Sequence, residues 1–427
     1  MQTATDPKPG AVVFDRRQVY RPFLERLNPI GSSQGLLANG LIVAPDHDPR
    51  NAGDPPIHVA LANTAELTRG SQMALVGGIG SGKTTELLLT QKELNRHGDA
   101  VNIFVDMADY TDLSEISPGA ILATAGIRLY SRLRSWLKKR GKELPDAIKA
   151  AHGELRELAF GKTKWVEAEG LEPYGDEPDD DRQPVPVEVP GVMKLRLPAL
   201  RSQVAEIMAK LDMIASPLLG DEAQITFLVD GLDRLIRPEL FREFTEQDLQ
   251  ALKGTKISVI IVAPLLLWYD KSRFLQDYFD VVKHIPAAAP GPRSSAFLRQ
   301  ILQRRGALDL MDRTEIAAIA KYSGGVLRDL LTLARSSAEY AYRDAEDRIG
   351  RGHVNAAIKQ LGNRYLVGLG NTHRRLLRRL IGHGEFPIEN STARELLVNR
   401  QVLEYFKGGV DYFAVHPALA KMLPKPA

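Results

Sequence analysis

The sequence predicts an α/β fold in which a parallel β-sheet is followed by a helical lid and a C-terminal winged-helix domain. Three patterns predict it. A glycine-rich loop, Gly77 to Thr84, joins an apolar run to a helix-like segment. Strand-like and helix-like segments then alternate, which is typical of a parallel sheet with helices on both faces. The chain closes with two helix-like segments and a hairpin, the order of a winged helix.

The composition is that of a chain with enough apolar residues for two or three cores. Of its 427 residues 44% are hydrophobic, and 56 Lys and Arg against 53 Asp and Glu leave a formal charge of +3. So small a charge excludes a global attraction to nucleic acid, and such binding would need a local patch. Cysteine is absent, which excludes disulfides and thiolate metal sites. With no apolar stretch of about 18 residues and no signal-peptide pattern, we expect a cytoplasmic protein without membrane contact.

The glycine-rich loop has the residues of a phosphate-binding P-loop in the required context. The apolar run 73–76 before it predicts a buried strand, and the residues after Lys83 predict a helix. Successive N–H groups of such a loop surround the β-phosphate, the Lys83 ammonium reaches β- and γ-oxygens, and the Thr84 hydroxyl ligates Mg²⁺. The expected nucleotide-binding residues are Gly77, Gly78, Ile79, Gly80, Ser81, Gly82, Lys83, Thr84 and Thr85. We therefore expect ATP or ADP with Mg²⁺ at this loop.

A second nucleotide motif is the apolar run 225–229, which ends in Asp230. As a Walker B strand it would hold Mg²⁺ beside Thr84, whereas the alternative is that Asp230 only caps a helix. Many such ATPases place glutamate directly after this aspartate, but here Gly231 follows. Asp233 is then the nearby carboxylate that can act as the catalytic base or position the attacking water.

The next strand-like run, 256–264, ends in Ala263 and Pro264, where an amide or hydroxyl sensor is expected. The missing sensor and the missing glutamate both favour slow hydrolysis, which suits a switch better than a motor.

The run 280–286 is expected to close the sheet, and a helical region follows from 294 to 368. Within it, SGGVLRDLL places Arg328 just inside a helix, where it can reach the γ-phosphate from a lid. The alternative is that Arg328 pairs with a surface acid.

These patterns predict domain boundaries. Residues 1–60 form an N-terminal extension, 61–290 the P-loop core, 291–369 the helical lid and 370–427 the winged-helix domain. An acidic, proline-rich insertion near 163–192 interrupts the core, and we interpret it as a solvated surface loop.

The first helix of the winged-helix region is strongly amphipathic. Leu376, Leu377, Leu380 and Ile381 recur on one face, and the other face carries Arg374, Arg375, Arg378 and Arg379. These arginines could neutralise nucleic-acid phosphates, or they could form an exposed face without a ligand. No clear helix is predicted between Phe386 and Thr392, so a DNA-reading helix-turn-helix is not well formed.

The motifs GGIGSGKTTEL, FLVDGLDRL, IIVAP and SGGVLRDLL together resemble bacterial AAA-like ATPases of the STAND class, close to the NACHT and origin-recognition groups. The resemblance runs from about Leu61 to the C-terminus. It implies an ATP-dependent switch in which Arg328 acts as the sensor 2 arginine. Because effector and sensor modules are not evident in this chain, it also implies a separately encoded effector or sensor in a bacterial conflict or antiviral system.

The segment FAVHPALAKML resembles the end of the winged helix in STAND proteins, where a histidine contacts the β-phosphate of ADP. His416 is the matching residue, although valine and proline flank it where methionine and aspartate are usual. The alternative is a buried packing histidine.

Other functional hypotheses stay open from the sequence. One is a DNA-associated ATPase of the origin-recognition or transposition-regulator type, and another is a nucleotide-stabilised scaffold without turnover. A nucleotide-dependent homo-oligomer is compatible with the chain, and Arg304 and Arg305 are candidates for reaching a neighbouring subunit.

Overall fold

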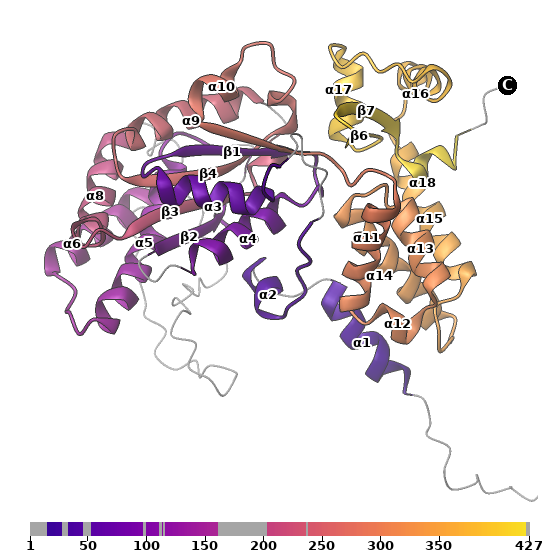
Figure 1. Ribbon diagram of the computed structural model, residues 1–427, viewed down its shortest axis with the longest axis horizontal. Helices are drawn as coiled ribbons and strands as arrows, with labels where there is room; N and C mark the ends of the chain where they lie inside the picture. Colours follow the sequence, from indigo (N-terminus) through magenta and orange to yellow (C-terminus); the bar gives the residue numbers. More distant parts are fainter. Residues whose placement is uncertain are drawn as a thin grey trace, which may run out of the picture. The chain divides into compact units, whose positions relative to one another are not determined.

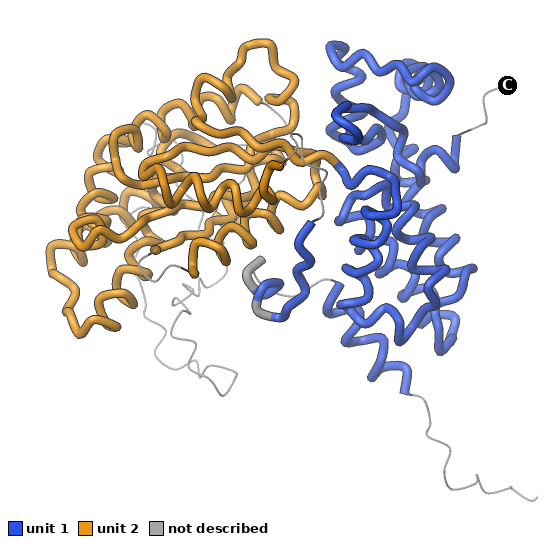
Figure 2. The backbone as a smooth tube through the Cα atoms, in the orientation of Figure 1, with its two compact units in different colours: residues 1–47, 287–427 blue, residues 48–286 orange. Residues whose placement is uncertain are grey.

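A computed structural model describes residues 15–27, 33–45, 53–96, 100–110, 113, 116–160, 203–235 and 238–423. The predicted acidic insertion near 163–192 therefore lies outside the described residues. The chain divides into two compact units (Figure 2): unit 1 combines Met1–His47 with Ala287–Ala427, and unit 2 is Asp48–Pro286.

Unit 2 contains a five-stranded parallel sheet. The strands are β1 (Gln72–Gly77), β2 (Ala100–Asp106), β3 (Gln224–Asp230), β4 (Ile257–Ala263) and β5 (Val281–Ile285), in the spatial order β2-β3-β4-β1-β5. The three central strands are buried along nearly their whole length. This explains their continuous runs of Val, Ile and Leu, since a parallel sheet is covered on both faces.

The helices of unit 2 are α3 (Ile57–Leu67), α4 (Lys83–Leu94), α5 (Ala120–Lys139), α6 (Asp146–Phe160), α8 (Val204–Gly220), α9 (Pro238–Leu252) and α10 (Phe274–Tyr278). Helix α3 precedes β1, and the other helices of this unit connect consecutive strands (Figure 1). Helix α4 packs on α3 and on the strands, and α5, α6 and α8 pack on one another. Short 3₁₀ turns, η1 (Met107–Asp109), η3 (Leu232–Arg234) and η4 (Leu265–Leu267), follow β2, β3 and β4. The carboxyl ends of these strands therefore lead into tight turns.

Unit 1 contains the helical lid and the winged helix. The lid comprises α11 (Pro292–Arg304), α12 (Ala307–Leu310), α13 (Arg313–Tyr322), α14 (Leu327–Arg343) and α15 (Arg351–Leu366). The winged helix comprises α16 (Asn371–His383), α17 (Ser391–Val398), the antiparallel strands β6 (Val402–Lys407) and β7 (Val410–Val415), and α18 (Pro417–Ala420). Because α17 begins only at Ser391, residues 384–390 form the connection expected from the weak helical pattern there.

One hydrophobic core spans the lid and the winged helix. Leu330 of α14, Leu361 of α15, Leu377 of α16 and Leu419 of α18 all belong to it. Gly362 shows how tightly α15 and α18 pack, because a Cβ there would lie 2.5 Å from the carbonyl oxygen of Ala418. The two predicted domains thus share a continuous packed interior.

The N-terminal segment also packs in unit 1. Helix α1 (Arg16–Leu27) buries Tyr20, Phe23 and Leu27 in the lid core, and α2 (Ser33–Ala38) follows it. The sequence predicted an extension before the P-loop core, and its packing on a region more than 250 residues later has no local sequence signal.

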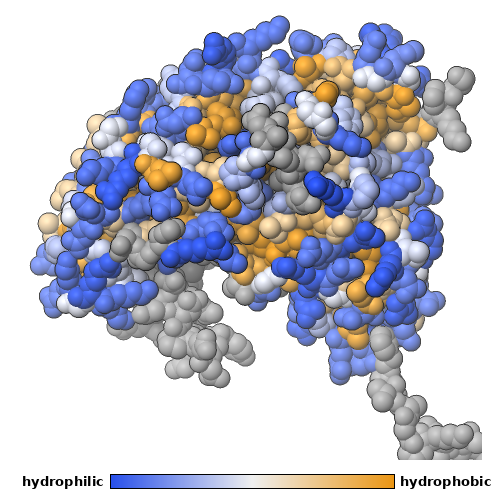
Figure 3. Space-filling model, viewed as in Figure 1, coloured by the Kyte–Doolittle hydropathy of each residue, from blue (hydrophilic) through white to orange (hydrophobic). Residues whose placement is uncertain are grey.

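The predicted fold class is confirmed: an α/β core with a parallel sheet, a helical lid and a C-terminal winged helix. Among the described helices, none is both long enough and apolar enough to cross a membrane. Hydrophilic side chains occupy much of the face seen in Figure 3, with apolar patches between them.

Candidate nucleotide-binding site

The P-loop joins β1 to α4 in a conformation that needs its glycines. Gly80 and Gly82 have φ of 83° and 110°, in the left-handed region that side chains disfavour. Gly77 has a different constraint, because a Cβ there would overlap the carbonyl oxygen of Ile285 at the end of β5 and would lie 2.7 Å from Ser81 Oγ. The glycines therefore permit both the turn and the close approach of β5.

The loop presents hydrogen-bonding groups with no protein partner among the described residues. Ser81 is buried, and its hydroxyl oxygen has no hydrogen-bond partner. The N-cap of α4 is Gly82, which has no side chain to accept hydrogen bonds from the first turn of the helix. An anion at this helix N-terminus would satisfy these donors, and the helix dipole favours its negative charge. The loop therefore fits a nucleotide phosphate.

Lys83 is 3% exposed, and its ammonium has three acceptors. Nζ donates to the carbonyl oxygens of Gly77 at 2.8 Å and Gly78 at 2.7 Å, and it lies 2.8 Å from Asp233 Oδ2. An ammonium has three N–H donors, so its donor capacity is filled. The structure thus brings together Lys83 and Asp233, two residues to which the sequence assigned catalytic roles.

Thr84 and Asp230 also meet, as expected for magnesium ligands. The Thr84 hydroxyl hydrogen-bonds to the Asp230 carboxylate, whose Oδ1 also accepts from the Gly231 N–H at 2.8 Å. Burial raises the pKa of Asp230, and the hydrogen bond from Thr84 opposes that rise. A hydroxyl and a carboxylate are hard oxygen donors of the kind that Mg²⁺ takes, so the pair fits this ion.

Two further carboxylates, which sequence reasoning missed, lie at the same edge of the sheet. Asp106 ends β2 in register with Asp230, and its Oδ1 accepts from the Ala108 N–H at 3.1 Å. Asp109 follows in η1, and its pKa is raised by burial and by the charge of Asp106. The sequence signal for Asp106 was its place near the end of the strand-like run 100–107, because parallel strands end at the same edge of a sheet as the P-loop.

The position of Asp106 explains the small residue after Asp230. Gly231 has φ of 90°, and a Cβ there would overlap Asp106 Oδ1. A glutamate at this position would therefore combine a strained backbone with a steric clash. The next strand, β4, ends at Ala263 as predicted, so the expected polar sensor is absent from that strand end.

A buried pair behind the P-loop was also missed. Glu86, in the first turn of α4, accepts from the backbone N–H of His58 at 3.0 Å and lies 2.9 Å from its Nδ1. Both side chains are buried. This pair attaches the start of α3 to the helix that carries the P-loop, a contact that local patterns do not reveal.

In unit 1, the two glycines of SGGVLRDLL lie where the lid meets the winged helix. Gly325 has φ of 78°, and a Cβ there would overlap the carbonyl oxygen of Ala288. The Gly324 carbonyl accepts from Tyr405 Oη at 2.8 Å, and Ala287 N–H donates to Glu404 O at 3.0 Å. The chain entering the lid is thus bonded to β6 before α11 begins.

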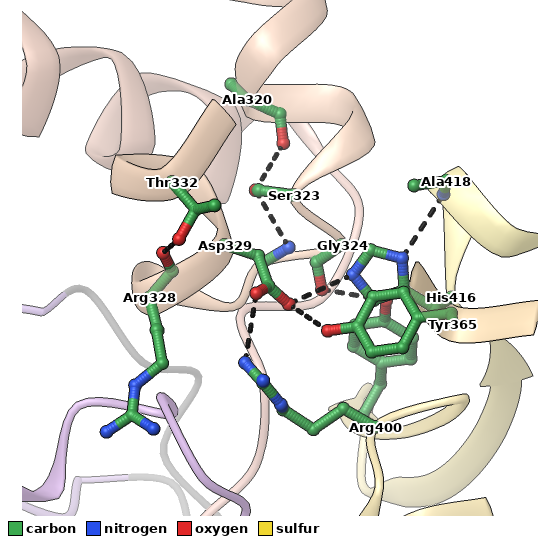
Figure 4. A network of polar contacts seen from close by, with 12 residues as sticks. Ala320, Ser323, Gly324, Arg328, Asp329, Thr332, Tyr365, Arg400, His416 and Ala418 are labelled. Atoms are coloured by element: carbon green, nitrogen blue, oxygen red, sulfur yellow. Dashed lines mark hydrogen bonds and ion pairs between the residues drawn. The ribbon is translucent and has the colours of Figure 1, made fainter. Parts of the chain in front are cut away.

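Arg328 and Asp329 follow these glycines and differ in environment. Arg328 is exposed, and Figure 4 shows its guanidinium directed away from the polar network around Asp329. Asp329 is 2% exposed and receives the hydroxyl of Tyr365 at 2.6 Å and a guanidinium nitrogen of Arg400 at 3.0 Å. The sequence motif therefore supplies one exposed cation and one buried anion.

His416 is the third partner of Asp329. Its ring is fully buried, its Nδ1 accepts from the Ala418 N–H at 3.2 Å, and its Nε2 lies 3.3 Å from Asp329 Oδ2 (Figure 4). Because Nδ1 accepts, a neutral ring carries its proton on Nε2, which lies at ion-pair distance from the carboxylate without the geometry of a hydrogen bond. Burial acts to raise the pKa of Asp329, but His416, Arg400 and Tyr365 together lower it. In this conformation a phosphate cannot touch His416, and the ring joins the winged helix to the lid.

Arg304 and Arg305 contact the chain's own N-terminal segment. Arg305 is 5% exposed and donates to the carbonyl oxygens of Arg26 and Leu41, and burial lowers its pKa to about 10. Arg304 donates to the carbonyl oxygens of Gly40 and Ile42. Both candidates for reaching a neighbouring subunit are thus engaged in unit 1.

The arginine face of α16 faces solvent as predicted. Arg375, Arg378 and Arg379 are exposed, Arg374 is partly exposed, and Arg379 pairs with Glu385. Leu377 and Leu380 are buried on the opposite side.

Solved structures with a related arrangement share little sequence with this chain. The Aeropyrum pernix ORC1 protein in complex with DNA is 16% identical, covering 93% of this chain and 95% of its own, with a TM-score of 0.42. For Cdc6p from Pyrobaculum aerophilum the identity is 15%, the coverage 97% and 94%, and the TM-score 0.35. The Thermotoga maritima RuvB Holliday junction branch migration motor is 13% identical, the match covers 86% of this chain and 92% of that chain, and the TM-score is 0.37. The chain matches no family model and no curated protein.

The chain's own geometry defines its class. It is an α/β protein with a P-loop after β1, an acidic end to β3 and the parallel strand order β2-β3-β4-β1-β5, followed by a helical lid and a winged helix.

Proposed function

We propose that this protein is an ATP-binding, slowly hydrolysing molecular switch of the STAND type. The observation that carries the proposal is a P-loop in which Lys83 pairs with Asp233 and Thr84 meets Asp230, while the buried Ser81 hydroxyl has no hydrogen-bond partner among the described residues. Calorimetry with ATP and Mg²⁺, together with phosphate release over hours, tests it. Micromolar or tighter, magnesium-dependent binding with slow turnover is expected, and the absence of nucleotide binding by the folded protein overturns it.

In the proposed reaction each residue has a separate role. The loop N–H groups and Lys83 bind the phosphates and stabilise the charge that develops on the γ-phosphoryl group. Thr84 and Asp230 hold Mg²⁺, which supplies charge neutralisation when bound. Asp233 positions the attacking water or accepts its proton. Arg328, exposed at the start of α14, is proposed to contact the γ-phosphate.

Two features of the described residues support a slow reaction. Gly231 stands where a catalytic glutamate would follow Asp230, and β4 ends in Ala263 without a polar side chain. Each missing group removes a contact to the attacking water or the γ-phosphate, and loss of a general acid or base typically costs about 10² to 10⁴ in rate. A long-lived ATP-bound state is useful to a switch.

The shared core of unit 1 indicates which part of the switch moves. Lid and winged helix are joined by apolar packing, by the Asp329 network and by the bond from Ala287 to Glu404, so we propose that unit 1 moves as one body. The chain contains no cysteine, so labels can be placed at two engineered cysteines. With labels at exposed Arg313 and Arg375, both in unit 1, the distance should not change with nucleotide. With labels at Lys92 of unit 2 and Arg375 of unit 1, the distance between the labels should change with nucleotide. A change in the distance between Arg313 and Arg375 would contradict the proposal that unit 1 moves as one body.

By family resemblance, we propose that the switch controls a separately encoded effector or sensor in a bacterial conflict or antiviral system, with nucleotide-dependent homo-oligomerisation as one output. Copurification with the products of neighbouring genes tests this proposal, and an ATP-dependent stable partner is expected. If the tagged protein recovers no partner with either nucleotide, the split system is rejected.

One observation favours a second function, that of a DNA-associated ATPase. Arg375, Arg378 and Arg379 lie exposed on one helix of a winged-helix domain. If they contact DNA phosphates, the logarithm of the binding constant must fall linearly with the logarithm of the salt concentration, and each lost phosphate contact must reduce the slope by about 1. Binding of duplex DNA by the wild type but not by Arg375→Ala/Arg378→Ala would establish this function.

A further inference from the structure

The ion pair between Lys83 and Asp233 joins two groups that the proposed reaction needs separately. The 2.8 Å separation of Lys83 Nζ from Asp233 Oδ2 is that of a charge-assisted hydrogen bond, and both side chains are largely buried, at 3% and 12% exposure. The other two ammonium donors are taken by Gly77 O and Gly78 O. A phosphate oxygen can therefore reach the ammonium only by displacing one of these three acceptors.

We propose that Asp233 is an internal competitor of the nucleotide phosphate for Lys83, so that binding of the nucleotide releases Asp233 for its role at the attacking water. This inference rests on the proposed ATP-binding function and adds regulation to the same site. Of the three acceptors, two are carbonyl oxygens of the P-loop backbone, and only the Asp233 carboxylate belongs to a side chain, which can turn away by rotation about its own bonds. It is also the only one with a full negative charge, the property that it shares with phosphate.

The competition has two consequences for the switch. The contact that Asp233 makes with Lys83 must be broken when a phosphate binds, which weakens nucleotide binding. The same contact engages Oδ2 of Asp233 until the phosphate arrives. Nucleotide binding and the supply of the water-positioning carboxylate thus become one event.

The test is the affinity of Asp233→Asn for ADP and for ATP, measured by calorimetry with Mg²⁺. The variant keeps the size of the side chain but removes the charge that competes with phosphate. Because a hydrogen bond between charged groups is stronger than a neutral one, we expect ADP and ATP to bind about 10-fold more tightly. Adenosine, which has no phosphate to compete, should bind equally to the variant and the wild type.

Asp109→Asn is the matched control. Asp109 lies in η1 after β2, and its neutralisation removes one negative charge from the same edge of the sheet without touching Lys83. If both variants gain affinity equally, general repulsion explains the effect and the competition is rejected. Unchanged or weaker affinity of Asp233→Asn, while the wild type binds ATP, also rejects it. Failure of the wild type to bind ATP would reject the proposed function itself.

Discussion

Asp329 Oδ2 lies 3.3 Å from Nε2 of His416, and this contact joins the first turn of a lid helix to the end of the winged-helix hairpin. Tyr365 of α15 and Arg400 of the turn between α17 and β6 bind the same carboxylate. A buried carboxylate is stable only when its charge and lone pairs are matched, and three partners match them here. The network therefore fixes the winged helix on the lid, next to the exposed Arg328.

The His416→Ala variant distinguishes this structural role from a nucleotide latch. Removing one partner of a buried carboxylate costs about 1 to 3 kcal/mol, so the variant should unfold at a lower temperature, measured by circular dichroism. Since the ring is fully buried, ADP and ATP affinities should change equally. A selective loss of ADP affinity with unchanged stability would instead support the contact to the β-phosphate that the sequence resemblance implies.

Lys83→Ala should remove high-affinity ATP binding while the fold is retained. The ammonium supplies a charge-assisted contact to phosphate, and its loss should weaken binding by about 100-fold or more. Calorimetry measures the affinity. Lys92→Ala, an exposed position on the same helix, is the control and should bind as the wild type does. An unchanged affinity in folded Lys83→Ala would remove the basis for the P-loop assignment.

Gly231→Ala should destabilise unit 2 and weaken the magnesium-dependent part of ATP binding. The new Cβ would occupy a backbone with φ of 90° and overlap Asp106 Oδ1, so a loss of about 1 to 3 kcal/mol is expected. Gly254→Ala shares the positive φ, 86°, but meets open space. All three tryptophans lie within Asp48–Pro286, so their fluorescence follows the unfolding of this unit. Equal losses in the two variants would show that backbone strain, and not Asp106, limits this position.

Asp248 predicts a pH dependence of stability. It is fully buried and accepts from the N–H groups of Gly119 and Ile121 at the start of α5, and burial raises its pKa to about 7. In the unfolded chain the carboxyl ionises near pH 4, so between about pH 4 and 7 the folded state binds more protons. Its contribution to stability therefore falls as pH rises through this window, by up to about 4 kcal/mol, and is constant above it.

The Asp248→Asn variant cannot ionise and should lack this component. Tryptophan fluorescence during urea unfolding at pH 5, 6 and 7 measures the difference in free energy of unfolding between variant and wild type. The difference should move in favour of the variant as pH rises. A difference that is the same at all three pH values would show that the hydrogen bonds from the α5 N-terminus keep the pKa of Asp248 near its ordinary value.

Most of the features that could be predicted depend on short contiguous segments of the sequence. The P-loop, the Asp230 strand, the alternation of strands and helices and the terminal hairpin were all predictable, because each depends on neighbours within about ten residues and on simple periodicity. The roles of Thr84 and Asp230 followed, since parallel strands end at one edge of a sheet. In the structure the Thr84 hydroxyl acts to lower the pKa of Asp230, and the roles of the two residues at magnesium stay a prediction.

Tertiary structure alone decided which charged groups meet. Lys83 and Asp233 were assigned separate tasks from the sequence, yet they form an ion pair, and His416 belongs to a network whose members come from four separate segments of the chain. The packing of α1 on the lid and the approach of Asp106 to Gly231 likewise join distant segments. A motif specifies the chemistry that its residues can perform. Burial removes a charged group from water and so makes a compensating partner necessary. It does not specify where in the chain that partner lies. The fold decides this, because it places one distant segment within hydrogen-bonding distance.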